Sequence, residues 1–357
     1  MKTERIARVV ARMQEEGLSQ ILVTAPNSVY YLTGMYVEPG ERMLALLVRD
    51  DGTVTLFANR LFALTDASTV PLVEFDDTED SVAVLAACLK PGAVGIDKFW
   101  PSQFTIRLMA ARRDIVPVLG SRPVDLCRMQ KDDEEVQLMI EASKFNDKII
   151  ENTITHIAPG MTEAEVSEMY SRYAKAEGIH GSSFEALICF GANCAEPHHA
   201  TDDTRLQDGD SIILDVGVPY RRYCSDMTRT VFFRSATDEQ KRVYDIVEKA
   251  NAAGRAAVRP GVALRDVDRA ARKVIEDAGY GKYFIHRTGH NIGLDVHELP
   301  DVSATSEAVA LPGMCFSVEP GVYLPGRFGV RVEDLVCVTE DGCLTLNALS
   351  RDFRVIG

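Results

Sequence analysis

The chain has 357 residues, of which 46% are apolar, and its formal net charge is −14. This is enough apolar material for two globular domains with separate cores, which argues against a disordered chain. Phosphate binding needs clustered lysine and arginine, so the acidic balance also argues against nucleic acid as a partner.

Neither a membrane segment nor a secretion signal is predicted. No stretch approaches the roughly 20 apolar residues of a membrane span, and the first residues, MKTER, lack the apolar core of a signal peptide. The eight cysteines include no CxxC pair, which indicates reduced thiols and not a disulfide framework or a thiolate zinc site. We therefore expect a cytoplasmic protein with no membrane partner.

The first third of the chain reads as a small α/β domain. Apolar residues on one face predict a helix over 4–16 that ends at Gly17. The turn Asp50-Asp51-Gly52 predicts a hairpin between two apolar runs. The expected strands are 21–23, 43–48, 53–57, 72–75, 94–97 and 115–118, and the other helices lie near 59–67, 80–89 and 101–112. We assign residues 1–127 to this domain.

A second domain is expected over residues 128–357. It opens with a long helical stretch over 132–157, whose first turn is acidic and so complements the helix dipole. Thr162 and Glu165 form a capping-box pattern that predicts the start of the next helix.

This second part of the sequence repeats itself. The Pro-Gly turn at 159–160 recurs at 260–261, 101 positions later, and the turn at Gly178 recurs at Gly279 with the same offset. The apolar run before Asp215 resembles the run before Glu319, 104 positions further on. Two halves in the same order predict a pseudo-two-fold α+β domain, in which these two carboxylates face each other across the axis.

Four acids share one kind of setting, at or beside an apolar strand. They are Asp215, Asp226, Glu319 and Glu333. A buried carboxylate is costly unless it is paired or binds a metal, and four together repel one another. Salt bridges to Arg229 or Arg331 could account for a single acid, but two divalent cations would balance all four. His290, between Gly289 and Gly293, adds a nitrogen ligand that suits Mn, Co, Fe or Zn.

The contexts of these residues, in chain order, are LDVG, SDMTRT, TGHNIG, VEPG and RVED. Their order resembles that of the pita-bread metallopeptidases: methionine aminopeptidase, Xaa-Pro aminopeptidase and prolidase. The resemblance covers residues 131–357. The additional N-terminal domain is similar to prolidase and Xaa-Pro aminopeptidase, and the segments around Arg42 and Arg287 resemble bacterial prolidases that cut Xaa-Pro dipeptides.

The resemblance implies two divalent metal ions per chain, with Mn or Co favoured and Zn or Fe as alternatives. Asp215 would chelate one ion, His290 and Glu319 would bind the other, and Asp226 and Glu333 would bridge the pair. A metal-bridging hydroxide would attack the Xaa-Pro peptide bond, and Glu319 would carry the proton to the leaving proline nitrogen.

Several further residues are candidates by the same resemblance. His198 and His297 match positions that contact substrate and stabilise the oxyanion. On a strand, Arg331 faces the same side as Glu333, so it can orient the ligands or meet a substrate carboxylate. The other histidines, His156, His180, His199 and His286, are expected to be structural.

The substrate pocket is less defined. Arg287 is a candidate for the proline carboxylate, with a surface salt bridge as the alternative, and Phe184 either lines the proline pocket or belongs to the core. The loop around Arg42 either reaches a partner's active site in a homodimer, as the resemblance suggests, or is a surface turn. The segment before His198 departs from the pattern of many relatives, which affects substrate preference more than metal binding.

The leading interpretation is therefore a dinuclear metal-dependent Xaa-Pro dipeptidase. An Xaa-Pro aminopeptidase acting on longer peptides is the alternative, and a non-catalytic binding protein of the same fold is disfavoured because all five ligands are present.

Overall fold

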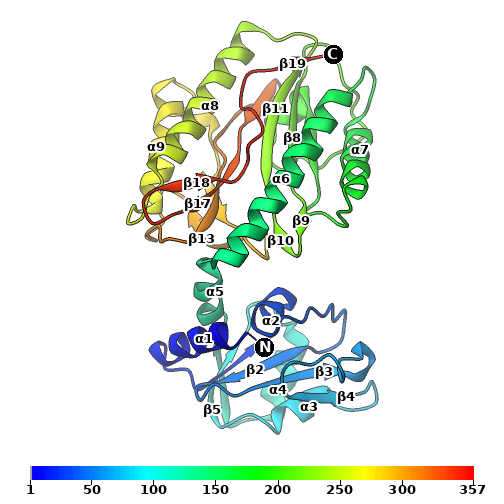
Figure 1. Cartoon of the computed structure of the whole chain (residues 1–357), viewed down its shortest axis with the longest axis vertical. Helices are drawn as coiled ribbons and strands as arrows, with labels where there is room; N and C mark the ends of the chain where they lie inside the picture. The colour runs from blue at the N-terminus through cyan, green and yellow to red at the C-terminus, as the bar shows by residue number, and fades with distance from the viewer. Residues whose placement is uncertain (1) are drawn as a thin grey trace. The chain divides into compact units, whose positions relative to one another are not determined.

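A computed structural model describes residues 2–357, which form two compact units. The first unit ends at Arg128 and the second comprises Met129–Gly357 (Figure 1). This confirms the predicted two-domain architecture, with a smaller α/β domain followed by a larger α+β domain. Among the described residues, no helix is long and apolar enough to cross a membrane, and all eight cysteines are free thiols.

The N-terminal unit is built on a mixed six-stranded sheet in the order β4-β3-β2-β1-β5-β6. The predicted hairpin is present, since β2 and β3 pair antiparallel. The buried side of this sheet packs against α3 and α4 in a core that includes Trp100 and Phe104. Its elements are α1 (Thr3–Glu15), β1 (Gln20–Val23), α2 (Pro26–Thr33), β2 (Ala45–Arg49), β3 (Val54–Asn59), η1 (Arg60–Phe62), β4 (Leu72–Phe75), α3 (Ser81–Ala86), β5 (Gly92–Ile96), α4 (Ser102–Ala111), β6 (Ile115–Leu119) and α5 (Arg122–Met129).

The prediction of a helix near 59–67 is wrong. Only one 3-10 turn, Arg60–Phe62, forms there. The Asn59 side chain accepts the backbone N–H of Leu61 at its start, and Ala63 adopts the left-handed region with a φ of 51°, which ends the turn at once. Sequence reasoning also missed the helices α2 and α5.

The C-terminal unit contains the predicted repeat. Its elements are α6 (Asp133–His156), α7 (Glu163–Ala176), β7 (Leu187–Phe190), η2 (Gly191–Ala195), β8 (Ser211–Val216), β9 (Pro219–Tyr220), β10 (Tyr223–Cys224), β11 (Met227–Phe233), α8 (Asp238–Ala257), α9 (Leu264–Asp277), η3 (Gly281–Tyr283), β12 (Gly289–Asn291), β13 (Glu298–Val302), β14 (Cys315–Val318), β15 (Gly321–Leu324), β16 (Phe328–Arg331), β17 (Asp334–Val338), β18 (Cys343–Thr345) and β19 (Val355–Ile356).

The two halves match strand by strand. In one sheet β8 pairs antiparallel with β7 and β11, and in the other β14 pairs antiparallel with β12 and β17. Both the first and the last residues of α7 and α9 are 101 positions apart, as the sequence predicts. The pseudo-two-fold fold is therefore confirmed.

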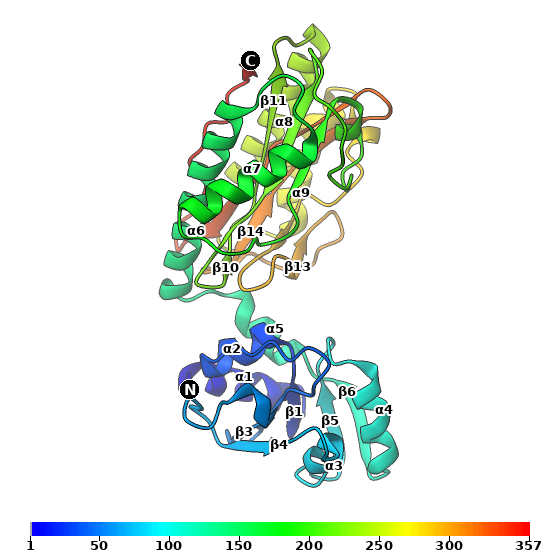
Figure 2. The ribbon, with the colours of Figure 1, turned by 90° about the vertical axis from the view of Figure 1, so that its right-hand side faces the viewer.

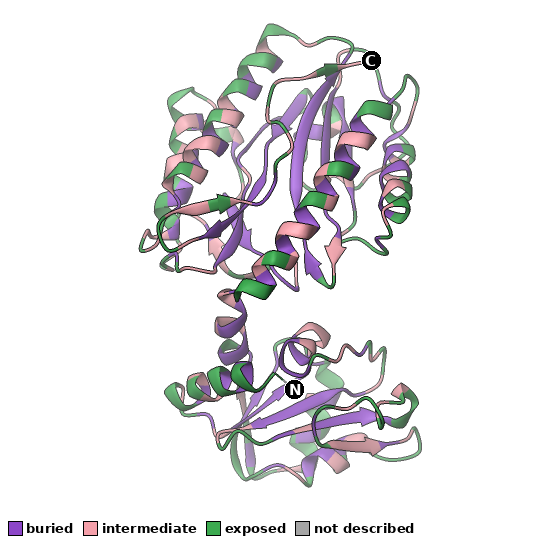
Figure 3. Cartoon of the chain, in the orientation of Figure 1, coloured by how far each residue is buried: buried purple, intermediate pink, exposed green. Residues whose placement is uncertain are grey.

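The helices cover the outside of the two sheets. Figure 2 shows α6 and α7 lying over one sheet and α8 and α9 beside the other. The central strands β8, β11, β14 and β17 are almost entirely buried, while the helices expose their outer faces (Figure 3). The predicted capping box at the start of α7 is present, because Thr162 and Glu165 each bond the other's backbone N–H.

Candidate active site

All five predicted ligands line one cavity of about 680 Å³ in the C-terminal unit. Asp215 lies on β8, Asp226 directly precedes β11, and His290 lies on β12. Glu319 directly follows β14, and Glu333 directly precedes β17. Asp226 and Glu333 thus occupy equivalent places in the two halves, as Asp215 and Glu319 do. His290 has no counterpart, since β7 carries no histidine.

The ligand atoms are close enough to share a cation. One ligand atom each from Asp226, His290 and Glu333 lie within 4.8 Å of one another. The Nε2 atom of His290 is 3.7 Å from Asp226 Oδ2 and 3.5 Å from Glu319 Oε1. Asp226, His290 and Glu333 are each at most 4% exposed, so solvent does not screen their charges.

The charge of this cluster is not balanced by the protein. Burial, followed by repulsion from neighbouring carboxylates, raises the pKa of Asp226 and of Glu333 well above the usual range. Burial likewise raises the pKa of Glu319 to about 7, against the attraction of Arg331. Asp226 Oδ1 is buried without a hydrogen-bond partner. A buried carboxylate oxygen without a hydrogen-bond partner, surrounded by other carboxylates, fits a site for divalent cations.

His290 is in the protonation state that a metal ligand needs. Burial, with repulsion from His297, lowers the pKa of His290 to about 3, so the imidazole is neutral at physiological pH. Its Nδ1 lies 3.2 Å from the carbonyl oxygen of Asn291, which leaves Nε2 to face the carboxylates.

Serine and threonine hydroxyls orient the ligands. Ser317 Oγ accepts the backbone N–H of His290 at 3.0 Å and donates to Glu319 Oε1 at 3.1 Å. This contact requires β12 to approach β14 closely, and a Cβ on Gly289 would lie 1.9 Å from the Ser317 carbonyl oxygen. On the other side, Thr228 Oγ1 donates to Glu333 Oε2 at 2.8 Å.

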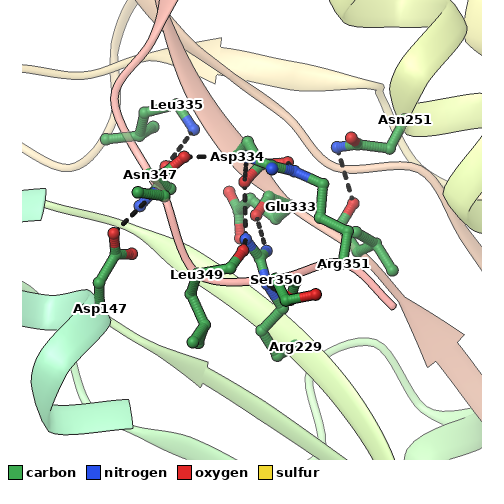
Figure 4. A network of polar contacts seen from close by, with 12 residues as sticks. Asp147, Arg229, Asn251, Glu333, Asp334, Leu335, Asn347, Leu349, Ser350 and Arg351 are labelled. Carbon is green, nitrogen blue, oxygen red and sulfur yellow. Dashed lines mark hydrogen bonds and ion pairs between the residues drawn. The ribbon is translucent and has the colours of Figure 1, made fainter. Parts of the chain in front are cut away.

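Behind Glu333, a buried ion network fixes the chain. Asp334 is fully buried and bonds Arg229 at 2.8 Å and Arg351 at 2.6 Å, while Arg255 lies 3.6 Å away. Arg229 also donates to the carbonyl oxygen of Glu333 at 2.7 Å. Figure 4 shows how these contacts join the strand that follows Glu333 to the segment that contains Leu349 and Ser350.

Arg331 lies inside the cavity and meets ligands, not solvent. Its guanidinium donates to Asp215 Oδ2 at 2.5 Å, to Thr228 Oγ1 at 3.1 Å and to the Tyr323 hydroxyl at 3.0 Å. The Thr228 hydroxyl joins it to Glu333, although β16 ends at Arg331 and Glu333 lies between β16 and β17, so the two residues do not share one strand as predicted. With Asp215 as its partner, Arg331 is placed to orient a ligand.

His198 and His297 both line the cavity. The ring of His297 packs edge-on against that of His290, with the centroids 4.3 Å apart, and burial lowers its pKa. The roles of both residues in oxyanion stabilisation stay predictions.

The three substrate candidates differ in their placement. Phe184 and Arg287 line the cavity. Arg287 forms an ion pair of 2.5 Å with Asp301, and both side chains are at least one-third exposed, so the salt bridge considered from the sequence is present. Arg42, in the N-terminal unit, bonds Asp77 at 2.8 Å and Glu41 at 2.9 Å.

Sequence reasoning missed two residues of the cavity region. His286, expected to be structural, lines the cavity, and its Nε2 lies 2.8 Å from the Tyr323 hydroxyl. Tyr323 therefore connects His286 with Arg331. Tyr323 lies in β15, between Glu319 and Glu333 in the sequence. This position between two predicted ligands is the only signal in the sequence that could have identified it.

Comparison with known proteins gives the family. Residues 137–340 match the model of metallopeptidase family M24, and residues 5–130 match the creatinase/prolidase N-terminal domain. An uncharacterised peptidase of Staphylococcus aureus (strain USA300) is 34% identical over 346 residues, 95% of this chain and 97% of its own.

Two solved structures show the same fold along the whole chain. Recombinant prolidase from Thermococcus sibiricus is 32% identical, with a TM-score of 0.96 over 100% of this chain and 99% of the other. X-Pro aminopeptidase from Thermotoga maritima is 28% identical, with a TM-score of 0.84 over 97% and 100%. The chain therefore belongs to metallopeptidase family M24 and is a peptidase with a prolidase-like fold.

Proposed function

We propose that this peptidase hydrolyses the Xaa-Pro bond of dipeptides and depends on two divalent cations. The observation that carries the proposal is the convergence of four carboxylates and one neutral imidazole in a single cavity. Among the described residues, Arg331 is the only guanidinium bonded to one of these carboxylates. Likeness to a prolidase over the full chain supports the choice of bond.

The donor set divides between two ions as the family pattern implies. Asp215, Asp226, His290, Glu319 and Glu333 would together hold the ions. When bound, the ions would supply a nucleophile at neutral pH and polarise the scissile carbonyl. Oxygen ligands with one imidazole suit Mn or Co, and also accommodate Zn or Fe.

The protein's own side chains would then handle protons and charge. Glu319 would accept a proton from the attacking water and deliver it to the proline nitrogen. His198 and His297 line the same cavity and would donate hydrogen bonds to the oxygen that becomes negative. Arg287, whose partner Asp301 is 45% exposed, is free to exchange it for the proline carboxylate.

A panel of dipeptides tests the proposal directly. The enzyme should release proline from Xaa-Pro dipeptides when Mn or Co is added, and chelation should abolish release. It should not remove the first residue of an Xaa-Pro-Yaa tripeptide. Activity on the tripeptide alone, or activity that persists with less than about one metal ion per chain, would refute the proposal.

One observation favours the alternative, an Xaa-Pro aminopeptidase. A second cavity of about 680 Å³ shares Pro197, His198 and His286 with the first, so free space continues beyond His198. A longer peptide could extend into it. Comparison of kcat/KM for Xaa-Pro and Xaa-Pro-Yaa substrates decides between the two.

A homodimer whose Arg42 loop reaches the partner's site also stays a proposal. Measurement of the molecular mass in solution tests the dimer, and loss of activity in Arg42→Ala at an unchanged mass would support the contribution of the loop.

A further inference from the structure

Glu163 is a buried carboxylate that the proposed mechanism does not use. It occupies the first position of α7, where a glutamate usually faces solvent close to the helix N-terminus. Here its side chain is 0% exposed. Burial of a carboxylate is costly unless hydrogen bonds compensate for the lost water. The donors that bond the Glu163 carboxylate therefore show which parts of the chain it holds in place.

Four donors converge on this one carboxylate. Oε1 accepts the backbone N–H of Phe190 at 2.7 Å and the Asn193 amide at 2.9 Å. Oε2 accepts the backbone N–H of Asp202 at 3.1 Å and lies 3.0 Å from His199 Nε2. Since a carboxylate only accepts, His199 must donate from Nε2.

These donors lie at both ends of the segment 190–204. Phe190 ends β7 and Asn193 lies in η2, whereas His199 and Asp202 follow Pro197 and His198. The backbone N–H of Glu163 itself bonds the carbonyl oxygen of Thr204 at 3.1 Å. The Glu163 carboxylate therefore joins the two ends of this segment and holds it as a closed loop.

The loop carries His198 into the cavity, immediately next to an anchored residue. His198 lines the cavity, and its neighbour His199 is bonded to Glu163. The other end of the loop is fixed to the ligand strand, because β7 pairs with β8 and Leu187 lies opposite Asp215. The position of His198 relative to Asp215 thus depends on the Glu163 carboxylate.

We infer that Glu163 and His199 are positioning residues that hold His198 against the substrate carbonyl. The inference rests on the proposed function, which gives His198 its part in the reaction. The inference concerns the geometry of the loop and leaves the metal ligands unaffected. Measurement of metal content therefore distinguishes a failure of the inference from a failure of the proposed metal site.

The first test is Glu163→Gln, which keeps the volume but replaces one acceptor oxygen by an NH₂ group. Whichever oxygen is replaced, one backbone N–H, of Phe190 or of Asp202, then faces another donor, and the loop loosens. We expect kcat to fall about 10- to 100-fold, as for other partners that orient active-site groups, with metal content unchanged. Glu168→Gln, an exposed glutamate of the same helix, is the matched control and should keep wild-type activity.

A pair of His199 variants tests the bond if Glu163→Gln fails to fold. Gln at 199 can still donate to Glu163, whereas Phe keeps the ring and removes the donor. His199→Gln should retain at least about half of the wild-type kcat, and His199→Phe should lose about tenfold or more. Equal activity of the two variants would overturn the inference.

A double-mutant cycle with His198→Ala shows whether Glu163 acts through His198. Glu163→Gln should cost about tenfold in kcat when His198 is present and less than about twofold when it is absent. The same loss in both backgrounds, or no loss in either, overturns the inference while proline release by the wild type upholds the proposed function. If the wild type releases no proline, the proposed function fails and the inference with it.

Discussion

Asp226 illustrates at the scale of one residue why the site needs a cation. Its side chain is 5% exposed and its Oδ1 has no hydrogen-bond partner. Burial, with repulsion from the carboxylates of Asp215 and Glu319, raises its pKa well above the usual range. A charge in this position destabilises the metal-free fold, because like charges in a buried site repel strongly. The same charge becomes favourable when a cation is bound.

Asp226→Asn separates these two effects. We expect the variant to lose metal binding and more than about 100-fold in turnover, since even the outer partners of ligands cost about 10- to 100-fold. Without metal its melting temperature should equal or exceed that of the wild type, because one repelling charge is gone. Metal analysis and thermal denaturation with and without added Mn measure both.

The exposed Asp245 of α8 provides the control, and Asp245→Asn should behave as wild type. Wild-type metal content in Asp226→Asn would remove Asp226 from the ligand set.

The four carboxylates were predictable from the sequence because each lies in or beside a strand that the apolar pattern marks, and His290 was identified from its motif. The donors that orient them were not. Tyr323 Oη bonds His286 Nε2 and Arg331, and these contacts depend on how β15 and β16 pack against neighbours distant in the sequence. Periodicity places a side chain on a face, but it does not tell which hydroxyl meets which imidazole.

Among elements, periodicity predicted the long helix α6 but not the short helix α2. The helix expected over 132–157 is α6, Asp133–His156, which starts with a complete capping box. By contrast, α2 has only eight residues, several of them aromatic or β-branched, and its apolar residues show little helical periodicity. Its helix is held by burial of Val29, Tyr31 and Leu32, a tertiary effect that the local sequence does not carry.

The repeat offers a stability test at the start of α9. Ala263 is the N-cap there, without a side-chain hydrogen bond, whereas its counterpart Thr162 caps α7 with a capping box. Ala263 is partly exposed, so a hydroxyl fits. Ala263→Ser should raise the free energy of unfolding by about 0.5–1 kcal/mol, and Thr162→Ala should lower it by about 1 kcal/mol. Urea denaturation measures both, and a loss of stability in Ala263→Ser would contradict the equivalence of the two caps.

The ion network of Asp334, the first residue of β17, should lose stability when its carboxylate is neutralised, unlike the metal-free site at Asp226. Asp334 is the carboxylate shared by Arg229, Arg255 and Arg351. Asp334→Asn leaves the buried guanidinium of Arg229 without a counter-charge, and we expect a loss of about 3 kcal/mol or more in the free energy of unfolding. Metal affinity should fall as well, because Arg229 fixes the Glu333 carbonyl. Asp352→Asn, in the exposed part of the same segment, should change neither quantity.

For the whole molecule, the proposed metal ligands divide between the two halves of the C-terminal unit. Asp215 and Asp226 come from the first half, and His290, Glu319 and Glu333 come from the second. Bound ions would therefore tie the halves together, and their binding free energy would add to the stability of this unit. The N-terminal unit has its own core and contributes no ligand.

A single tryptophan makes this division measurable. Trp100 is the only tryptophan of the chain and is 6% exposed in the core of the N-terminal unit, so its fluorescence reports the unfolding of that unit. Far-ultraviolet circular dichroism reports both units. Added metal at about 100 times its dissociation constant should stabilise the C-terminal unit by about 2.7 kcal/mol and raise the transition seen by circular dichroism. The fluorescence transition should stay in place, and a shift of equal size would show that the two units unfold together.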